Sequence, residues 1–525
     1  MTNPLYKKVG VASLIMMASV FLSRLIGIFR EMVIAYTGGA GGDVDAYQVA
    51  FVIPEILNHI LASGFLSVTF IPIFSNYLVQ DKEETAWEVF SIIFNGFGFI
   101  LLLLILTAGI FAPELIQIIA PGLRDPVLIE SAVRMTRIIL PAQFFFFTGG
   151  LFMAVQFAKE KFSIPALAPL VYNLGIIAGG IFLGPWLHME GFSWGVLIGA
   201  FVGNFALQYW GAVRIGMKFQ IKFDFRHPDL RKYVWLTLPL MVGLTMTFST
   251  EFFIKFFGSY LPRGSIAGLN YGLRIMLVLV GFFGQALGMA SFPFLARLAA
   301  EKNMREMNRL LNSTLRYLSL VIPFSVLLMV LRREIVLILF QRGRFDAAAT
   351  DMTSALLIYL LIGAIAFSAQ TVVVRGYYAT QNTLFPAVFG TLAVILSIPM
   401  YLYGMQAMGA SGVALAISLS AIFQVTLLYS LWNKKSRNRE GRDVYTFFLK
   451  IIVLSIPMGI FLEWFKTIIG SVFHSTTFWG SLYVSVITGM VFLFILVFTG
   501  YLFHIKEITE MLNRAVYRVK RSAVR

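Results

Sequence analysis

The sequence predicts an all-α, polytopic membrane protein, and three observations carry that prediction. The chain has 525 residues, is 58% hydrophobic and only 13% charged, whereas a soluble domain carries about 25% charged residues. Its mean hydropathy is +0.81. Apolar runs long enough to cross a bilayer, about 20 residues each, follow one another along the whole chain.

We count about 14 such runs, separated by short loops. They lie near residues 11–36, 44–78, 88–112, 127–157, 162–184, 193–213, 232–258, 266–296, 309–331, 350–378, 384–403, 411–432, 444–470 and 478–503. The first run carries charges in its middle, so we interpret it as a mature helix and not a signal peptide. No loop exceeds about 20 residues, which leaves no soluble domain and disfavours an enzyme.

Basic residues orient the predicted bundle. Most of the 42 Lys and Arg fall on one side if both termini are cytoplasmic, as the positive-inside rule requires. The basic clusters are Lys7–Lys8, 214–232, 297–309, 434–442 and the tail from Lys506. The stretch "LRREIVLILFQRGRF" falls on the opposite side, and we predict a short amphipathic helix at the outer interface there.

An internal repeat divides the chain. "FAKEKFSIPALAP" (157–169) aligns with "YATQNTLFPAVFG" (378–390), and the first spans of the two halves keep the same offset. Because six spans is an even number, the two copies are expected to be parallel repeats with a site between them. We predict a six-helix lobe at 1–220, a second at 221–440, two additional helices at 441–504 and a basic cytoplasmic tail at 505–525.

Charged and polar residues inside the predicted spans are the candidate functional residues, because a charge at the bilayer centre costs about 2.5–3.5 kcal/mol. Ser23 and Arg30 share one face of the first span, and Arg24 lies on another face. The others are Glu31, Asp45, Glu55, Asn58, His59, Glu251, Lys255 and Arg274.

Simpler interpretations stand beside the functional one. Glu251 and Lys255 are spaced i, i+4 and can neutralise each other, Glu55 and His59 can form a local hydrogen bond, and Arg24 can snorkel to the interface. A cavity lined by arginines suits a diphosphate or carboxylate, because the guanidinium fork binds such groups bidentately. An anionic amphiphile therefore fits better than a cationic drug.

Other chemistry has little support in the sequence. The chain has no cysteine and only 5 histidines, none paired at i, i+4, so a metal site and a disulfide framework are not expected. The net charge of +16 is explained by cytoplasmic loops and not by nucleic acid.

The segment "SRLIGIFREMVIAYTGGAGGDVDAYQVAFVIPEILNHILASGFLSVTFIPIF" (23–74) resembles the lipid II flippase family (MurJ/MviN) of the multidrug/oligosaccharidyl-lipid/polysaccharide exporter superfamily. The resemblance continues through "KFSIPALAPLVYNL", "ALGMASFPFLARLAA", "FQRGRF" and "RGYYATQNTLFPAV". It implies a flippase of the bacterial plasma (inner) membrane that moves lipid-linked peptidoglycan precursor from the inner to the outer leaflet by alternating access.

The resemblance also implies roles for individual residues. Ser23, Arg24, Arg30 and Arg274 match family positions that meet the diphosphate–sugar head group, while Glu31 and Asp45 match acids that balance charge or gate the cavity. The last two helices match the family's groove for the prenyl tail. Lipid II or a related prenyl-diphosphate-linked saccharide is the implied substrate, membrane lipids are the other partners, and we expect a monomer.

This chain departs from the family at several positions. Asn58 and His59 replace arginines, and Asn382 replaces an acid, which weakens the case for a sodium site. We predict that Lys255 partly replaces the lost arginine. No cofactor is expected, and coupling to membrane potential, protons or sodium stays open.

The alternatives are a flippase for another lipid-linked oligosaccharide and a multidrug antiporter. A membrane-embedded glycosyltransferase and a pure scaffold are disfavoured.

Overall fold

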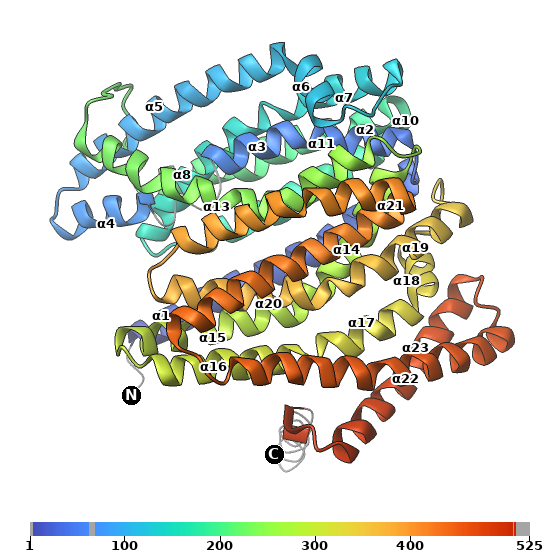
Figure 1. Ribbon diagram of the computed structural model, residues 1–525. Helices are drawn as coiled ribbons and strands as arrows, with labels where there is room; N and C mark the ends of the chain where they lie inside the picture. The colour runs from blue at the N-terminus through green and yellow to red at the C-terminus, as the bar shows by residue number, and fades with distance from the viewer. Residues whose placement is uncertain (1–3, 62–68, 508, 511–525) are drawn as a thin grey trace. The chain divides into compact units, whose positions relative to one another are not determined.

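The computed structural model describes residues 4–61, 69–507 and 509–510, and these residues form helices joined by short turns, with no strand in that part of the chain (Figure 1). The predicted all-α class is therefore confirmed. The helices group into two compact units. Unit 1 comprises Met1–Ala267 with Arg342–Asp346, and unit 2 comprises Gly268–Gln341 with Ala347–Arg525.

Unit 1 is built from the first thirteen α-helices and the first turn of the next. They are α1 (Pro4–Gly38), α2 (Gly42–Ala50), α3 (Val52–Leu61), α4 (Ile71–Val79), α5 (Glu83–Ile110), α6 (Ala112–Ile119), α7 (Pro126–Ile139), α8 (Ala142–Ala158), η2 (Pro165–Leu167), α9 (Ala168–Phe182), α10 (Gly184–Leu187), α11 (Met189–Gly199), η3 (Ala200–Ala206), α12 (Leu207–Arg214) and α13 (Pro228–Gly258).

Unit 2 contains the remaining helices, of which the last two form an antiparallel hairpin (Figure 1). They are α14 (Ser265–Val280), η4 (Gly281–Gln285), α15 (Ala286–Ala300), α16 (Met304–Leu318), α17 (Val321–Val330), α18 (Arg332–Phe340), α19 (Ala347–Ile362), α20 (Ala364–Ala379), α21 (Leu384–Ser436), α22 (Gly441–Phe473) and α23 (Phe478–Leu502).

Nine helical stretches within the described residues are long and apolar enough to cross a membrane, or ten if the bent pair α19–α20 is one span. One of them, α21, contains two of the predicted spans, 384–403 and 411–432. They are separated by a kink at Gly409, whose φ of +58° suits glycine. A multi-pass membrane protein is thus confirmed, and the number 14 stays a prediction.

The predicted second span, 44–78, is broken after α2. Pro54 has no N–H to donate to the carbonyl of Ala50, and its ring crowds that carbonyl. The buried Thr136 hydroxyl of α7 donates to the Ala132 carbonyl at 2.8 Å and also lies 3.3 Å from the Ala50 carbonyl oxygen. The proline thus separates α2, which ends at Ala50, from α3, which begins at Val52.

The packing units and the predicted lobes divide the chain differently, because the lobes derive from a sequence repeat. The helix α13 follows the predicted boundary at 220 but packs in unit 1. Its Asp229 accepts a 2.6 Å hydrogen bond from the Tyr77 hydroxyl of α4, and Ser259 just beyond it accepts one of 3.0 Å from the Gly122 backbone. The two six-helix lobes stay a prediction.

Candidate functional site

The polar face of α1 is held against α9. Asn173 of α9 is buried, accepts a 3.1 Å hydrogen bond from Arg30 Nη1 and donates one of 3.3 Å to the Ser23 hydroxyl. One turn towards the N-terminus of α1, the Ser19 hydroxyl donates a hydrogen bond to the carbonyl of Ala166. Ser23 and Arg30 therefore lie on the same face of α1, as their spacing predicts, and one amide bridges them.

Arg30 is also paired with its sequence neighbour. Its Nη2 lies 2.6 Å from Glu31 Oε1, and the two side chains are 21% and 6% exposed. A guanidinium has five N–H donors. Nε of Arg30 has no hydrogen-bond acceptor among the described residues. The group is thus positioned by two protein acceptors, and its Nε–H is buried without one.

Asn173 belongs to this group of side chains, and the sequence analysis did not predict it. It lies inside "KFSIPALAPLVYNL", where it is the one amide in an apolar helix. That isolation is the signal that would have found it, because a buried amide needs a hydrogen-bonding partner. Its partners are about 150 residues away in sequence, so periodicity within one helix does not reveal them.

Arg24 lies on a different face of α1 from Ser23 and Arg30, and it is exposed. Glu31 follows it at i+7 and therefore shares its side of the helix. The adjacent Gly27 is open, since a Cβ built there would meet no atom within 4 Å. A side chain at position 27 would therefore have no neighbour, whereas Glu31 one turn further along is buried.

The polar residues of α3 form a second small group. Glu55, Asn58 and His59 are all half-buried. His59 Nδ1 lies 2.7 Å from the Glu55 carbonyl oxygen, and the imidazole packs 5.5 Å from the Phe248 ring of α13. The His59 ring is thus hydrogen-bonded to the backbone of α3 and packs against Phe248 of α13.

Glu251 and Lys255 form an ion pair within α13. The Lys255 side chain is 2% exposed and that of Glu251 is 21% exposed. This is the self-neutralising arrangement that the i, i+4 spacing allows.

Asp45 joins α2 to the beginning of α14. Its two carboxylate oxygens accept hydrogen bonds from the backbone N–H of Gly264 at 2.5 Å and of Ala267 at 2.8 Å. A carboxylate that receives the unpaired N–H groups of a helix start acts as a cap and favours the helix dipole. The first turn of α14 is in this way fixed to α2.

Two residues that were singled out by the family resemblance, Arg274 and Asn382, lie in unit 2. Arg274 is half-buried on α14. Asn382 accepts a 3.2 Å hydrogen bond from the Phe385 backbone and so caps the start of α21. An amide serves that capping task as well as a carboxylate.

The structure brings Ser23 and Arg30 together through Asn173, and Arg30 pairs directly with Glu31. Separately, it pairs Glu251 with Lys255, and His59 with the backbone of Glu55. Within the described residues, no group of three His, Asp or Glu side chains could hold a metal ion. The cationic and amide groups around Arg30 are of the kind that bind and orient an anion.

Comparison with known proteins identifies the relatives of the chain. A family model described as "Lipid II flippase MurJ" matches residues 34–483. A "Probable lipid II flippase MurJ" of Buchnera aphidicola subsp. Baizongia pistaciae is 29% identical over 447 residues, which are 84% of this chain and 87% of that protein. The "Lipid II flippase MurJ" of Burkholderia cenocepacia is 26% identical over 453 residues, 84% of this chain and 87% of that protein.

Solved structures share the fold. "Lipid II flippase MurJ, inward closed conformation" superposes with a TM-score of 0.73 at 24% identity, covering 92% of this chain and 98% of that chain. An inward-facing multidrug resistance MATE family transporter of the MOP superfamily superposes with a TM-score of 0.62 at 15% identity, covering 80% of this chain and 99% of that one.

Proposed function

The chain belongs to the MurJ family of lipid II flippases, and from this premise we propose that it moves lipid II from the inner to the outer leaflet by alternating access. It is a multi-pass inner-membrane transporter and not an enzyme. The observation that supports a diphosphate head group best is Arg30. Its guanidinium is aimed by Asn173 and Glu31 and keeps an unbonded N–H.

A head-group site on α1 explains this arrangement physically. Placing an arginine in an apolar bundle is costly unless it meets a counter-charge or water. One carboxylate neutralises Arg30 in the resting protein, and a diphosphate can share or replace it with stronger, bidentate bonds. We propose that Ser23, Arg24, Arg30 and Arg274 bind the head group, with Glu31 and Glu55 balancing their charge.

The decisive experiment measures lipid II in the outer leaflet of the host cell. The protein is depleted, and an externally added toxin that cleaves lipid II reports how much of it is exposed. Depletion is expected to protect lipid II, and a plasmid copy of the wild type to restore cleavage. If cleavage continues unchanged after depletion, lipid II is not the cargo that requires this protein.

Variants then locate the site. Arg30→Gln and Arg274→Gln are expected to abolish rescue, and Asn173→Ala to reduce exposure of lipid II by about tenfold, because misorientation of a binding group is costly. The control is Arg134→Gln, an exposed arginine paired with Glu130 and Glu190, which should rescue fully.

We propose that Lys255 partly replaces an arginine that the family carries on its second span. Because Lys255 is buried and paired with Glu251, the swap requires the pair to open when substrate arrives. Lys255→Ala should then lower transport. Glu251→Gln should leave the Lys255 ammonium available for the substrate, and transport should continue. If Lys255→Ala transports at the wild-type rate while Arg274→Ala does not transport, this role of Lys255 is rejected.

We propose that Asp45 gates the cavity. Its carboxylate holds the first turn of α14, so a change in that contact would alter how α14, which carries Arg274, is held. Asp45→Asn keeps one acceptor oxygen and is expected to slow transport without abolishing binding. An unchanged rate of lipid II exposure in Asp45→Asn would show that this cap is purely structural.

A flippase for another lipid-linked oligosaccharide is the second candidate. Asn58 and His59 stand where the family resemblance implies arginines, so fewer cations are available for the head group. If depletion leaves lipid II exposure intact but stops the surface display of a different glycan, this candidate replaces the first.

We propose that both termini are cytoplasmic and that the protein acts as a monomer. Since the chain lacks cysteine, single cysteines report topology without background. Thr476→Cys, between α22 and α23, should react with an impermeant maleimide in intact cells. Arg439→Cys, between α21 and α22, should react only after lysis, and the reverse result would invert the topology.

A further inference from the structure

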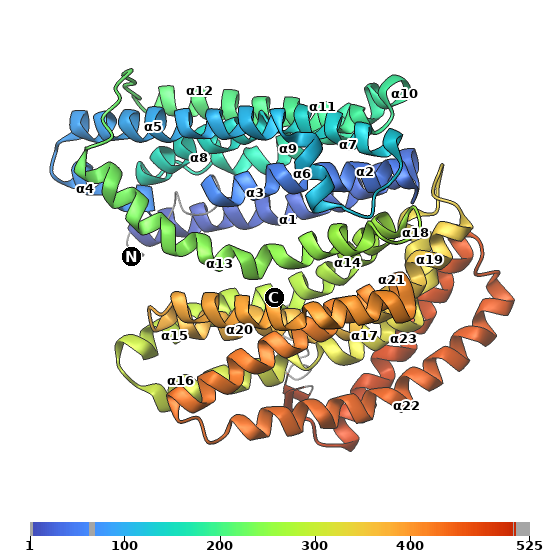
Figure 2. The ribbon, with the colours of Figure 1, turned by 45° about the horizontal axis from the view of Figure 1, so that its top comes forward.

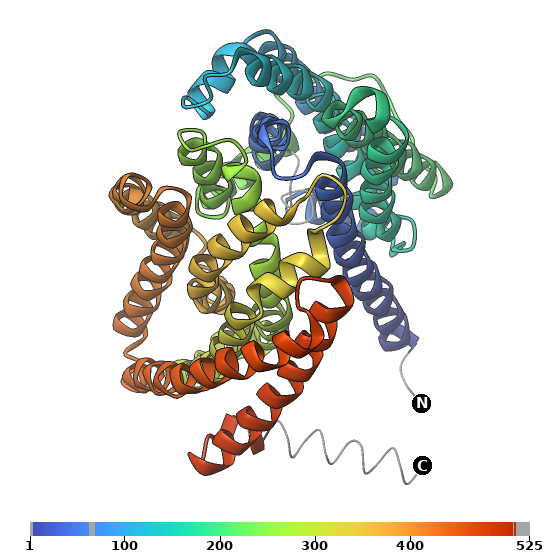
Figure 3. The same ribbon diagram turned by 90° about the vertical axis from the view of Figure 1, so that its right-hand side faces the viewer.

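The connection between α18 and α19 docks onto the end of α1. Residues 342–346, here called the 342–346 loop, belong to unit 1 although the helices on either side belong to unit 2. The Arg344 backbone N–H donates a 2.9 Å hydrogen bond to the Tyr36 carbonyl. Figure 3 shows the yellow loop beside the dark-blue end of α1.

Two glycines make this contact possible. Gly343 has φ +59°, and a Cβ there would lie 2.4 Å from the Tyr36 oxygen. Gly39 has φ +69°, and a Cβ there would lie 2.6 Å from the Arg344 oxygen. Any larger residue would clash at either position, so the loop is fixed on α1 by backbone contact and its arginines are presented at a defined place.

An open groove of about 600 Å³ lies beside the loop, bounded by α1, α9, α10 and the loop itself. Its apolar wall is a stripe on α1 that includes Phe29, Val33 and Tyr36, with Ile181 of α9. Phe29, Tyr36 and Ile181 are 53%, 58% and 50% exposed. Side chains of this kind face lipid in a membrane protein.

The polar end of the groove is basic. Arg342, Arg344 and His188 line it, and no acidic residue is among the described side chains that do so. Both arginines are exposed. The groove therefore joins a cationic end to an apolar wall, which matches an anionic lipid with its phosphate at one end and its acyl chain along the other.

The groove is distinct from the candidate transport site. Phe29 and Tyr36 are spaced i, i+7, and Val33 at i+4 completes their stripe. Arg24 and Glu31 lie on the far side of α1 from this stripe, and Arg30 points to Asn173. The groove therefore lies opposite Arg24 and Glu31 on α1, and it borders the face of Arg30 at Thr37.

We propose that this groove is a binding site for an anionic phospholipid, whose phosphate is held by Arg342 and Arg344 and whose acyl chain lies along Phe29, Val33 and Ile181. With the proposed topology the lipid belongs to the outer leaflet. Bound there, it ties the 342–346 loop to α1, so that the lipid stabilises the contact between them. The proposal does not depend on which lipid-linked glycan is transported.

The test measures lipid binding to the full-length protein by native mass spectrometry. Phosphatidylglycerol and phosphatidylcholine are titrated separately onto the detergent-purified wild type and the double variant Arg342→Gln/Arg344→Gln. The variant is expected to bind the first phosphatidylglycerol at least about tenfold more weakly, the usual effect of losing charge-assisted hydrogen bonds. Binding of phosphatidylcholine should change little.

A control variant removes two other exposed arginines of unit 1, Arg124→Gln/Arg263→Gln, with the same change in net charge. It should bind phosphatidylglycerol like the wild type. Equal weakening in both variants would mean nonspecific attraction to a basic surface and would overturn the proposal. Wild-type affinity in Arg342→Gln/Arg344→Gln would overturn it as well.

Two further arms separate other outcomes. Soluble glycerol phosphate should not displace the lipid, because it lacks the acyl chain; displacement at similar concentrations would reveal a site for free phosphate and reject the lipid. If the double variant is not monodisperse, Arg342→Gln alone and Ile181→Gln, on the apolar wall, are titrated instead. Both are expected to weaken phosphatidylglycerol binding, and wild-type affinity in both would reject the site.

Discussion

Two helix contacts in this protein are held by opposite means. In unit 1, α9 and α11 lie side by side (Figure 2) and touch through backbone. A Cβ on Gly179 would lie 2.5 Å from the Gly195 Cα, and one on Gly175 would lie 2.5 Å from the Gly199 Cα. The spacing of four residues on each helix is the small-residue pattern that lets membrane helices approach closely.

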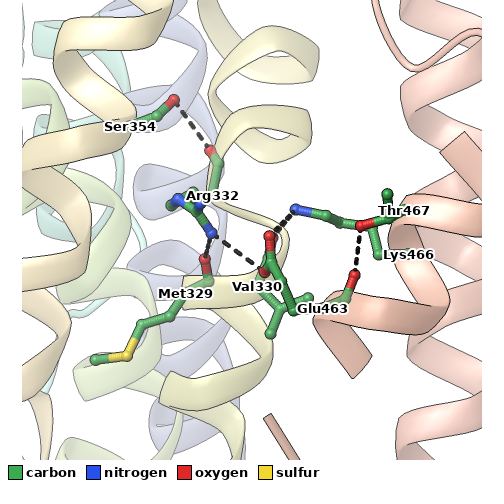
Figure 4. A network of polar contacts seen from close by, with 7 residues as sticks. All are labelled: Met329, Val330, Arg332, Ser354, Glu463, Lys466 and Thr467. Carbon is green, nitrogen blue, oxygen red and sulfur yellow. Dashed lines mark hydrogen bonds and ion pairs between the residues drawn. The ribbon is translucent and has the colours of Figure 1, made fainter. Parts of the chain in front are cut away.

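In unit 2, α22 is attached by side chains. Glu463 accepts hydrogen bonds from Arg332 at 3.3 Å and from Lys466 at 2.9 Å (Figure 4). Arg332 and Lys466 also donate to the carbonyls of Met329 and Val330, at 2.8 Å each. These carbonyls end α17 and have no partner further along that helix, so the polar group satisfies them while joining α22 to the unit.

An apolar cluster completes the attachment of α22. Val330, Met458, Leu462 and Phe492 are buried together, and the ring of Phe492 packs edge-on against Phe324 at 5.0 Å. Most of the rest of α22 and α23 is exposed, with 22% and 17% of their apolar windows buried. The glycine contact therefore tolerates no added atom, whereas α22 depends on a few side chains that can each be weakened separately.

The largest effect is expected from adding atoms to the glycine contact. Gly195→Val would place a Cβ 2.6 Å from the Gly175 carbonyl oxygen, and the backbone of α9 cannot yield without separating the helices. Overpacking of this kind costs about 1–3 kcal/mol or more. The yield of monodisperse protein after detergent extraction should collapse, while Gly489→Val on α23, where a Cβ meets nothing within 4 Å, should extract normally.

The next largest effect concerns the apolar cluster. Phe492→Ala leaves a cavity beside Phe324, and truncations of buried phenylalanine cost about 3–5 kcal/mol in soluble proteins. Here only α22 and α23 should loosen, because α9 and α11 do not contact the cluster. Amide hydrogen exchange should rise in these two helices alone. Phe494→Ala, at a side chain that is 72% exposed, is the control and should leave exchange unchanged.

A smaller effect is expected at the polar group of Figure 4. Glu463→Gln removes the charge that Arg332 and Lys466 share, which costs about 1 kcal/mol for a half-exposed group. A cysteine pair at Val326 and Gly459, whose side-chain positions adjoin, should crosslink more slowly in the variant. An unaltered crosslinking rate would mean that the apolar cluster alone holds α22.

The smallest effect on stability is expected at an exposed ion pair of α19. Asp351→Asn breaks the ion pair in which Arg333 Nε lies 2.8 Å from Asp351 Oδ1. The Arg333 side chain is 41% exposed and that of Asp351 is 59% exposed. Exposed ion pairs contribute only about 0–1 kcal/mol. Thermal aggregation of the purified variant should therefore match the wild type within error, and a large shift would show that charge at this end of α19 matters more than its exposure suggests.

Local patterns in the sequence predicted much of the architecture. The apolar runs predicted the helical membrane class, and the spacing of Ser23 and Arg30 placed them on one face of α1. These features depend on neighbours within a few residues, where helix geometry fixes which side chains meet. The ion pair of Glu251 and Lys255 was readable for the same reason.

Only the tertiary structure decided which distant groups satisfy these helices. Asn173 accepts a hydrogen bond from Arg30, and Asp45 caps α14. The Thr136 hydroxyl approaches the carbonyl freed by Pro54, and the 342–346 loop joins unit 1. Each pairing links residues that are far apart along the chain, and its choice depends on how whole helices pack. The sequence by itself therefore determined the helices and the type of buried charge, whereas packing decided their partners, because a buried polar group takes whichever partner the fold brings within hydrogen-bonding distance.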